Sequence, residues 1–515
     1  MLSHKYFCSF VVMTIPRHKL VSYLVVLICC IPLFYINIFD RSSWGDDFSQ
    51  YIKEALNIAN GKPWYSTTYI YNPQNTVYAP PVYPPGYPLL LAPIVKIWGI
   101  SYRAIGYFNA FLIVCIAMAL LSWFRRHTGK VAAVCLTLMV VYANQILDLK
   151  WNALSDIAGL LFVSLYFTCR GNSGERWRWQ QILLLSVIAV MAILVRSQVI
   201  LLPLAELLYP LLLVIHQLLT RQKKSNLKIV AINSLLVGGS VLLLHQLLNS
   251  TVFRAPHQSF DFYNGFIERA IKEPFHIITY HMGWLHFEYL ELFHYRTFTD
   301  PTDVIGLFAA QAAVAAAAAG ILILWVRRLI VEDVFFMLTS GMALMLPAHD
   351  PRYILPIMPV FYLYAYTGVH TVALAITRKY TVWIALAIVL CWFRIGYNYM
   401  RIGATTTPEG LMPNADDLVA FDRLKTMVND SDIILFVKPR VLALYTGKRT
   451  ITESWQEGIP ENKEYLEKAG VRYILLRHGL DEHFYRAYMQ VTPPLDSTEV
   501  NSQYVLYRMP LPVSK

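Results

Sequence analysis

The chain lacks the short motifs that identify nucleotide-driven pumps and common hydrolases. Its 515 residues contain no P-loop, no Gly-x-Ser-x-Gly turn and no dinucleotide-binding fingerprint. Without a P-loop an ATP-driven pump is unsupported, and without the Gly-x-Ser-x-Gly turn an ordinary serine hydrolase is unsupported. Charge is also scarce, because Asp, Glu, Lys and Arg together make up 15% of the sequence. Most of the chain is therefore apolar, and the apolar pattern determines its class.

Cysteine is missing from every polar segment in which it could form a disulfide or bind zinc. All seven cysteines lie in long apolar runs or near loops rich in lysine and arginine: Cys8, Cys29, Cys30, Cys115, Cys135, Cys169 and Cys391. None falls in the polar segments 40–103, 249–302 or 398–515. The sequence therefore predicts neither a disulfide framework nor a zinc site.

Long apolar runs dominate the sequence. Hydrophobic residues make up 56% of the chain, and its mean hydropathy is +0.43. Runs of about 20 apolar residues cross the ~30 Å hydrocarbon core of a bilayer as helices. We predict eleven such helices, at approximately residues 20–39, 104–124, 131–147, 153–169, 181–195, 199–219, 229–248, 303–326, 334–348, 353–376 and 380–397. The alanine run at 314–319 predicts a helix that packs through small residues.

Lysine and arginine cluster in alternate loops between these runs. The basic segments are the N-terminus and the loops after the second, fourth, sixth, eighth and tenth runs, whereas the intervening short loops hold only Lys150, Arg196 and Arg352. By the positive-inside rule, the N-terminus is cytoplasmic and the C-terminus lies outside. The net charge of +11 is then an orientation signal beside anionic lipid, and it requires no nucleic-acid partner.

Two polar segments are predicted to lie as loops outside the cytosol. Segment 40–103 contains an amphipathic helix at 47–60, which begins beside Asp46 and Asp47, at the end where the helix dipole favours negative charge. It continues with a stretch dense in proline and tyrosine, which we expect to be a stiff structure on the bilayer surface. Segment 249–302 is rich in histidine and aromatic residues, which suits a membrane interface.

The last polar segment, 398–515, alternates strand-like and helix-like stretches, which predicts a small α/β domain. The expected strands and helices are, respectively, 432–437, 471–477 and 504–509, and 415–428, 460–469 and 481–489. We therefore divide the chain into an all-α polytopic membrane domain at 1–397, with external loops 40–103 and 249–302, and an extracytoplasmic α/β domain at 398–515.

Three carboxylates stand near the predicted external side. Asp46 and Asp47 can cap the helix that follows them, or one can accept a proton while the other orients a substrate or ion. Asp156 lies one turn inside the fourth run, where a carboxylate is costly enough to indicate function, although its side chain could also reach the interface. Both interpretations stay open for each carboxylate.

Two arginines reach the same side against the trend of the loop charges. Arg196 follows the fifth run, and Arg352 follows the ninth, with His349 and Asp350 beside it. Such an arginine can form a structural salt bridge, to Asp350 or Asp156. It can also clamp a phosphate, because the guanidinium fork matches phosphate oxygens. The sequence is compatible with both roles.

Four elements, taken in order, resemble the pattern of a known family. They are an acidic pair with an amphipathic helix, a Tyr/Pro-rich element, a Ser-acid motif and an Arg-Tyr-x-x-Pro element: Asp46, Asp47, Tyr51, Ala55 and Gly61; Tyr83, Pro84, Pro85, Gly86 and Pro88; Ser155 and Asp156; Arg352, Tyr353 and Pro356. Over residues 20–400 the chain resembles the GT-C superfamily of polytopic glycosyltransferases. The similar branch contains the protein O-mannosyltransferases and the bacterial aminoarabinose transferase (glycosyltransferase family 39-like).

The resemblance implies a reaction and the groups that perform it. A sugar on a polyprenyl phosphate would be transferred outside the cytosol with inversion, and an aspartate of the first loop would be the general base. Aligning on the acidic pair selects Asp46, whereas aligning on Tyr51 selects Asp47. Bacterial relatives often have a lysine where this chain has Tyr83, so contact with the donor phosphate would fall to Arg352 together with Arg196.

We therefore expect a lipid-phosphate-sugar-dependent glycosyltransferase of a bacterial inner membrane, without a metal or other cofactor. Its expected partners are the polyprenyl-phosphate donor, a lipid, glycan or protein acceptor, and membrane lipids. The expected catalytic residues are Asp46 and Asp47, and the expected substrate-binding residues are Asp156, Tyr83, Arg196, His349, Asp350, Arg352 and Tyr353.

Two other functional classes stay open. One is a transporter or flippase for an envelope glycan or lipid-linked sugar, which usually places charges near the bilayer midplane and has repeated halves. The other is a binding or scaffold protein that acts through residues 398–515.

Overall fold

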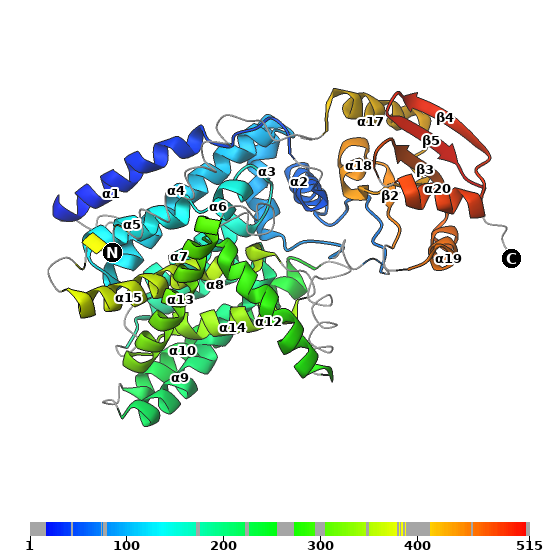
Figure 1. Ribbon diagram of the computed structural model, residues 1–515. Coiled ribbons are helices and arrows are strands. Elements are labelled where there is room, and N and C mark those ends of the chain that lie inside the picture. The colour runs from blue at the N-terminus through cyan, green and yellow to red at the C-terminus, as the bar shows by residue number, and fades with distance from the viewer. Residues whose placement is uncertain are drawn as a thin grey trace, which may run out of the picture.

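A body of helices carries a smaller unit that contains a β-sheet, as a computed structural model of the chain shows (Figure 1). The structure describes residues 17–42, 45–73, 75, 80–170, 176–221, 226–254, 272–293, 304–346, 350–377, 381, 383–384, 387, 413–454, 457–480 and 482–510. The predicted boundary between residues 397 and 398 lies outside these ranges.

Apolar helices form the body, and they coincide with ten of the eleven predicted runs. They are α1 (Arg17–Cys30), α4 (Tyr102–His127), α5 (Lys130–Val141), α7 (Asp156–Cys169), α8 (Trp179–Val195), α9 (Leu201–Thr220), α10 (Leu227–Thr251), α13 (Val304–Arg327), α14 (Val331–Met345) and α15 (Met358–Ile376). The eleventh run, 380–397, lies almost wholly outside the described residues.

The length and composition of these helices identify an integral membrane protein. Among the described residues, five helical segments are long and apolar enough to cross a bilayer: Tyr102–His127, Ser197–Thr220, Leu227–Thr251, Gly306–Arg327 and Leu355–Ile376. Others, such as α5, are shorter than a typical span, and the third predicted run is divided between α5 and α6 (Asn144–Leu149). The total of eleven spans and their orientation stay predictions.

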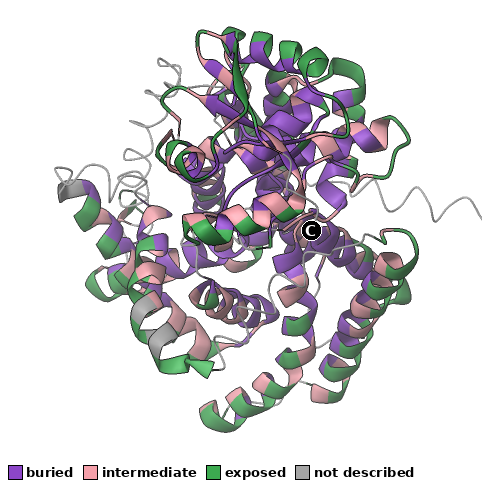
Figure 2. Cartoon of the chain, turned by 90° about the vertical axis from the view of Figure 1, so that its right-hand side faces the viewer, coloured by how far each residue is buried: buried purple, intermediate pink, exposed green. Residues whose placement is uncertain are grey.

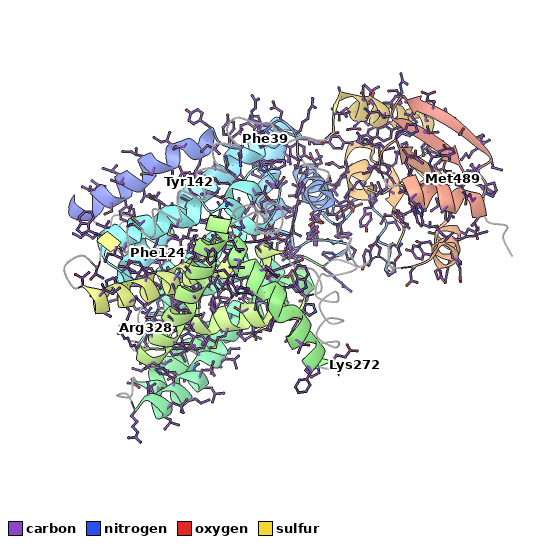
Figure 3. All side chains as sticks on the ribbon, in the orientation of Figure 1. Phe39, Phe124, Tyr142, Lys272, Arg328 and Met489 are labelled. Carbon is purple, nitrogen blue, oxygen red and sulfur yellow. The ribbon has the colours of Figure 1, made fainter. Side chains whose placement is uncertain are left out.

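Side chains fill the space between the helices. Phe124 is fully buried within the body, whereas Lys272, beside the start of α12 (Pro274–Glu291), is exposed (Figure 3). The alanine run of α13 is a packing face as predicted, because Ala317 in the run and Ala313 just before it are fully buried and the helix lies directly against α15. Buried residues run through the interior, and exposed residues line the outer turns of the peripheral helices (Figure 2).

Short elements join the body at one end. They are η2 (Ile31–Phe34), α2 (Asp46–Ala59), α3 (Gly86–Trp98), η4 (Ser197–Ile200), η5 (Pro351–Tyr353) and η6 (Leu355–Ile357). The predicted amphipathic helix at 47–60 is confirmed as α2, and Gly61 follows its end with a positive φ of 67°. Helix α3 was not predicted, because the prolines of this stretch indicated only a stiff structure on the bilayer surface. Pro88 instead falls in the first turn of α3, where its missing N–H costs nothing.

The C-terminal unit, defined here as residues 413–510, has its own hydrophobic core, which includes Phe421, Ile434 and Ile474. Its elements are α17 (Ala415–Met427), β1 (Ile433–Leu435), α18 (Pro439–Thr446), β2 (Arg449–Ile451), α19 (Ile459–Ala469), β3 (Val471–Arg477), α20 (Glu482–Val491), β4 (Asp496–Asn501) and β5 (Tyr504–Arg508). All the predicted strands and helices of this unit are found. The short elements α18 and β2 and the polar strand β4 were not predicted.

The sheet has the strand order β2-β1-β3-β5-β4. Strand β1 pairs in parallel with β2 and β3, whereas β5 pairs antiparallel with β3 and β4. Helix α18, between β1 and β2, packs against α2, so the N-terminal loop and the C-terminal unit meet beside the body (Figure 1).

Candidate active site

Helix α2 lies between the helical body and the C-terminal unit, and it positions the acidic pair. It packs against α3 on one side and α18 on another. Its amphipathic pattern produces this arrangement, because Ile52 and Ala55 are fully buried. Asp46 and Asp47 form its first turn, where the exposed backbone N–H groups favour negative charge. Adjacent residues on a helix point in directions about 100° apart, so the two carboxylates have different neighbours.

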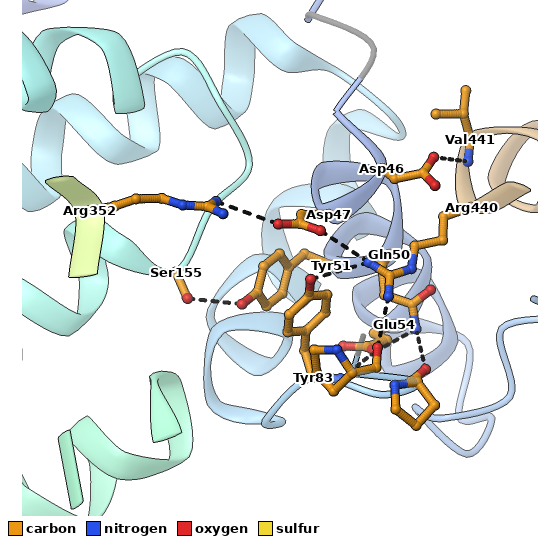
Figure 4. A network of polar contacts seen from close by, with 12 residues as sticks. Asp46, Asp47, Gln50, Tyr51, Glu54, Tyr83, Ser155, Arg352, Arg440 and Val441 are labelled. Carbon is orange, nitrogen blue, oxygen red and sulfur yellow. Dashed lines mark hydrogen bonds and ion pairs between the residues drawn. The ribbon is translucent and has the colours of Figure 1, made fainter. Parts of the chain in front are cut away.

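Asp47 faces two guanidinium groups from distant parts of the chain (Figure 4). Its Oδ1 lies 3.0 Å from Nη1 of Arg440, and its Oδ2 lies 3.5 Å from Nη1 of Arg352. The side chain of Asp47 is 29% exposed. Burial alone would raise the pKa of Asp47, but Arg352 and Arg440 outweigh it and hold this pKa below the usual value. Asp47 therefore favours the ionised form, and its side chain is partly exposed to solvent.

Asp46 points instead at the N-terminus of α18. Its Oδ1 accepts a hydrogen bond from the backbone N–H of Val441 at 3.4 Å, and its Oδ2 is buried without a hydrogen-bond partner among the described residues. Burial raises the pKa of Asp46 to about 7, with Arg440 and Lys438 opposing the rise and Asp47 adding to it. The sequence allowed the two carboxylates to have different roles, and the structure gives them different environments.

The burial of Asp46 predicts how stability changes with pH. Because its pKa rises from 3.8 to about 7 on folding, the folded protein favours the protonated carboxyl. The cost of ionising Asp46 is absent below about pH 4, grows as pH rises, and reaches about 4 kcal/mol above about pH 7. We expect the stability of the wild-type protein relative to Asp46→Asn, measured by thermal unfolding in detergent, to fall between about pH 4 and pH 7. A difference that does not vary with pH would contradict this environment for Asp46.

Tyr83, from the Tyr/Pro-rich element, lies beside Asp47. Its ring stacks on that of Tyr51 at 4.3 Å between centroids, and its hydroxyl lies 3.2 Å from Nη1 of Arg440. The Tyr51 hydroxyl in turn lies 2.9 Å from Oγ of Ser155, the residue before α7. Glu54 lies one turn after Tyr51 on α2 and is fully buried. Its Oε1 accepts a hydrogen bond from the backbone N–H of Tyr83 at 3.1 Å. All four sequence motifs therefore contribute to this network of polar contacts, since Arg352 joins it through Asp47.

Asp156 and Arg196 form a buried ion pair next to this cluster. Arg196 Nη1 lies 2.6 Å from Asp156 Oδ1, and the Asp156 side chain is 1% exposed. The structural interpretation of Arg196 therefore holds for this pair, and Asp156 does not extend to the surface. Arg196 also donates a hydrogen bond to the backbone carbonyl of Arg352 at 3.3 Å. The pair thus fixes the segment that carries Arg352.

Arg352 is the more accessible of the two predicted arginines. Its Nε lies 2.8 Å from Asp350 Oδ2, and 26% of its side chain is exposed. The ring centroid of Tyr353 lies 6.0 Å from Cζ of Arg196 and 5.9 Å from Cζ of Arg352. Gln198 donates a hydrogen bond to the Tyr353 carbonyl at 3.2 Å. His349 lies outside the described residues. The structure brings together all the other predicted site residues.

Arg440 and Glu54 were not predicted from the sequence. Arg440 belongs to the short helix α18, and 393 positions of chain separate it from Asp47. No motif of the sequence marks either residue, since each is a common charged residue in an amphipathic stretch. Within the described part of the chain, no group of three or more His, Cys, Asp and Glu side chains is placed to hold a metal ion.

Comparisons with solved structures identify the fold. The archaeal oligosaccharyltransferase AglB from Archaeoglobus fulgidus, in complex with an inhibitory peptide and a dolichol-phosphate, is similar with a TM-score of 0.58 and 12% identity. This similarity covers 90% of the present chain and 69% of AglB. ArnT from Cupriavidus metallidurans, bound to undecaprenyl phosphate, is similar with a TM-score of 0.54 and 13% identity, over 96% of the present chain and 98% of ArnT.

Neither a family model nor a curated protein sequence matches the chain. The likeness is thus one of fold, and at 96% coverage it must extend beyond residues 20–400 into the C-terminal unit. AglB and ArnT are GT-C enzymes, so the resemblance that the four motifs indicated is confirmed at the level of the structure: the chain has the GT-C fold.

Proposed function

We propose that the protein is a glycosyltransferase that moves a sugar from a polyprenyl-phosphate carrier to an acceptor on the extracytoplasmic side of a bacterial inner membrane. The solved structures of the same fold support the carrier, because one holds a dolichol-phosphate and another holds undecaprenyl phosphate. The central observation is the meeting of an accessible carboxylate, Asp47, with the guanidinium of Arg352. This arrangement offers a proton acceptor beside a binding group for phosphate.

In the proposed reaction Asp47 is the general base. It takes the proton from an acceptor hydroxyl, whose oxygen attacks the anomeric carbon from the face opposite the phosphate. The bond between the sugar and the phosphate oxygen breaks, its electron pair stays on the phosphate, and the configuration inverts. Asp47 suits this role better than Asp46, because Asp47 is 29% exposed whereas Asp46 is buried beneath α18.

Arg352 is proposed to receive the charge that develops on the leaving phosphate. Its contact with Asp47, at 3.5 Å, is longer than its 2.8 Å contact with Asp350, so an incoming phosphate can compete for the guanidinium on the Asp47 side. The negative phosphate would raise the pKa of Asp47 at the same time, which makes the carboxylate a stronger base only when donor is present. Asp156 and Arg196 would hold Arg352 in place rather than touch the phosphate.

The remaining predicted residues have supporting roles in this proposal. Tyr83 occupies the place of the lysine found in bacterial relatives, and we propose that its hydroxyl borders the donor phosphate. Asp350 and Tyr353 orient Arg352, and His349 stays a candidate for contact with substrate. We also propose that no divalent metal takes part, so transfer should persist in EDTA.

The proposal is tested by comparing membranes that contain the wild-type chain with membranes that lack it. Mass spectrometry of envelope lipids, glycans and proteins should reveal a sugar addition that depends on the chain. The corresponding polyprenyl-phosphate sugar should accumulate when the chain is absent. If the chain were a transporter or flippase, its absence would instead leave the carrier sugar on the inner leaflet, and purified protein in vesicles would relocate that sugar without releasing polyprenyl phosphate. Relocation without transfer would therefore overturn the proposal.

A further inference from the structure

Arg440 is a fully buried guanidinium that the C-terminal unit inserts beside Asp47. Its Nη1 reaches Asp47 Oδ1 at 3.0 Å and the Tyr83 hydroxyl at 3.2 Å, and its Nη2 donates a hydrogen bond to the Pro80 carbonyl at 2.8 Å. The guanidinium also lies against two aromatic rings, 5.0 Å from the centroid of Tyr69 and 5.4 Å from that of Tyr83. A side chain held on so many sides has one orientation available, and that orientation is directed at Asp47.

The helix that carries Arg440 is anchored in the helical body as well. Leu444 of α18 belongs to the hydrophobic core of the body, although it comes from the C-terminal part of the chain. The N-terminus of α18 meets α2 through the hydrogen bond from Val441 to Asp46. Arg440 and these two contacts lie on one short helix. The position of Arg440 therefore depends on the docking of the whole C-terminal unit.

A second attachment ties the first loop to the sheet of the C-terminal unit. Ile70 N–H donates a hydrogen bond to the Thr450 carbonyl at 2.7 Å, and Thr450 N–H donates one to the Thr68 carbonyl at 3.2 Å. The loop thereby adds a short parallel bridge beside β2, the edge strand. Asn72 continues the contact, because its side chain donates a hydrogen bond to the Thr452 carbonyl at 2.9 Å. The segment before Tyr83 is thus held by the same unit that supplies Arg440.

We propose that Arg440 is a positioning residue, supplied by the C-terminal unit to the transfer centre, that fixes the Asp47 carboxylate opposite Arg352. This inference rests on the proposed function. Arg440 does not reach the reacting atoms, since its side chain is fully buried, and it acts on them through Asp47. The consequence is that the helical body alone has an incomplete centre, and that the docked C-terminal unit is part of the catalytic apparatus.

The charges around Asp47 determine what removal of Arg440 should do. Two cations face it, Arg352 from η5 and Arg440 from α18. Asp46 lies beside it on α2, and Tyr83 faces it from the segment that precedes α3. Asp350 and Lys438 act more remotely, the first on Arg352 and the second on Asp46. Loss of Arg440 leaves one cation, so Asp47 should bind a proton at higher pH than in the wild-type protein.

The decisive measurement is the pH at which Asp47 becomes protonated, compared between the full-length wild-type chain and Arg440→Met. A water-soluble carbodiimide reacts with protonated carboxyl groups, and peptide mass spectrometry locates the modified residue. We expect the midpoint for labelling of Asp47 to rise by about 1–2 pH units in Arg440→Met. The low-pH limb of the curve of transfer rate against pH should shift to higher pH by a similar amount. Arg440→Lys keeps the charge without the planar fork, so its midpoint should lie between the two.

Arg477→Met is the matched control. Arg477 lies in the same unit, pairs with the buried Asp417 at 3.1 Å and stands 5.8 Å from the Tyr504 ring centroid. Its loss removes similar interactions from the same unit without touching Asp47. It should therefore lower stability but leave the labelling midpoint of Asp47 in place.

Each outcome decides between a positioning role and a merely structural one. An unchanged midpoint in Arg440→Met, with activity lowered by the same factor at every pH, would overturn the proposal. Should Arg440→Met fail to fold, Arg440→Lys answers the same question, since a midpoint equal to that of the wild type with full activity would also overturn it. Labelling does not depend on turnover, so a wild-type chain that transfers no sugar would refute the proposed function while the position of Arg440 is still tested.

Discussion

Replacement of Asp47 by asparagine should lower the rate of sugar transfer by about 10²–10⁴-fold, the usual contribution of a general base. Asparagine has nearly the same shape and can still accept a hydrogen bond from Arg440, so the local structure should survive. It cannot take the proton of the acceptor hydroxyl. Transfer is best measured as sugar incorporated per amount of folded protein, with folding checked by size-exclusion chromatography in detergent.

Asp46→Asn is the matched control, because it makes the same change one residue earlier on the same helix. Asp46 is buried and its pKa is about 7, so its carboxyl is largely protonated at mildly acidic pH and an amide resembles it. We expect Asp46→Asn to retain transfer within about tenfold of the wild-type rate, since it removes no group that a substrate can reach. Equal losses in the two variants, or a larger loss in Asp46→Asn, would mean that Asp47 is not the base.

Much of the membrane body could be predicted from the sequence because its signal is local. A run of about 20 apolar residues has few alternatives to a helix inside a bilayer, since every backbone polar group must be paired within the segment. The same reasoning found α2, whose alternating faces and terminal Gly61 lie in one short stretch. The position of the acidic pair at the start of a helix therefore follows from the sequence alone.

The contact between Asp47 and Arg440 could not be predicted, because nothing local encodes it. Helix α18 has only eight residues and begins with proline, which is too short for a periodic pattern to stand out. Its partner lies 393 positions away, and a single arginine in a polar segment is ordinarily solvated. Leu444 packs into the hydrophobic core of the helical body and so holds α18 in position. This is a tertiary contact that no local sequence pattern encodes.

The two predicted arginines show where sequence reasoning reaches its limit. Arg196 and Arg352 both ran against the loop-charge trend, and either could have paired with Asp156 or Asp350. The structure pairs Arg196 with Asp156 in a nearly dry site and leaves Arg352 partly exposed next to Asp47. The two arginines differ in how far their side chains are buried, 12% exposed for Arg196 and 26% for Arg352. A hydropathy pattern does not predict such a difference in burial between two residues at the ends of apolar runs.

A backbone contact between α13 and α15 predicts the largest effect on stability. A Cβ added to Gly320 would lie 1.9 Å from the Tyr364 carbonyl oxygen, and one added to Gly368 would lie 2.0 Å from the Ala316 carbonyl oxygen. Each position therefore admits glycine alone unless the two helices move apart. Both helices lie within predicted spans, where close approach of small residues is the main source of association between helices.

Gly320→Val and Gly368→Val should each destabilise the protein by about 3 kcal/mol or more, at or above the upper end of the usual cost of overpacking, because the opposing atoms are backbone and cannot change rotamer. Thermal unfolding in detergent, followed by size-exclusion chromatography, measures the loss. Gly341→Val is the matched control, since Gly341 lies on α14 and a Cβ there would meet nothing within 4 Å. Helix α13 contacts the rest of the body mainly through α15, so separating this pair should also lower the yield of folded protein. Wild-type stability in both variants would show that the two helices are not in backbone contact.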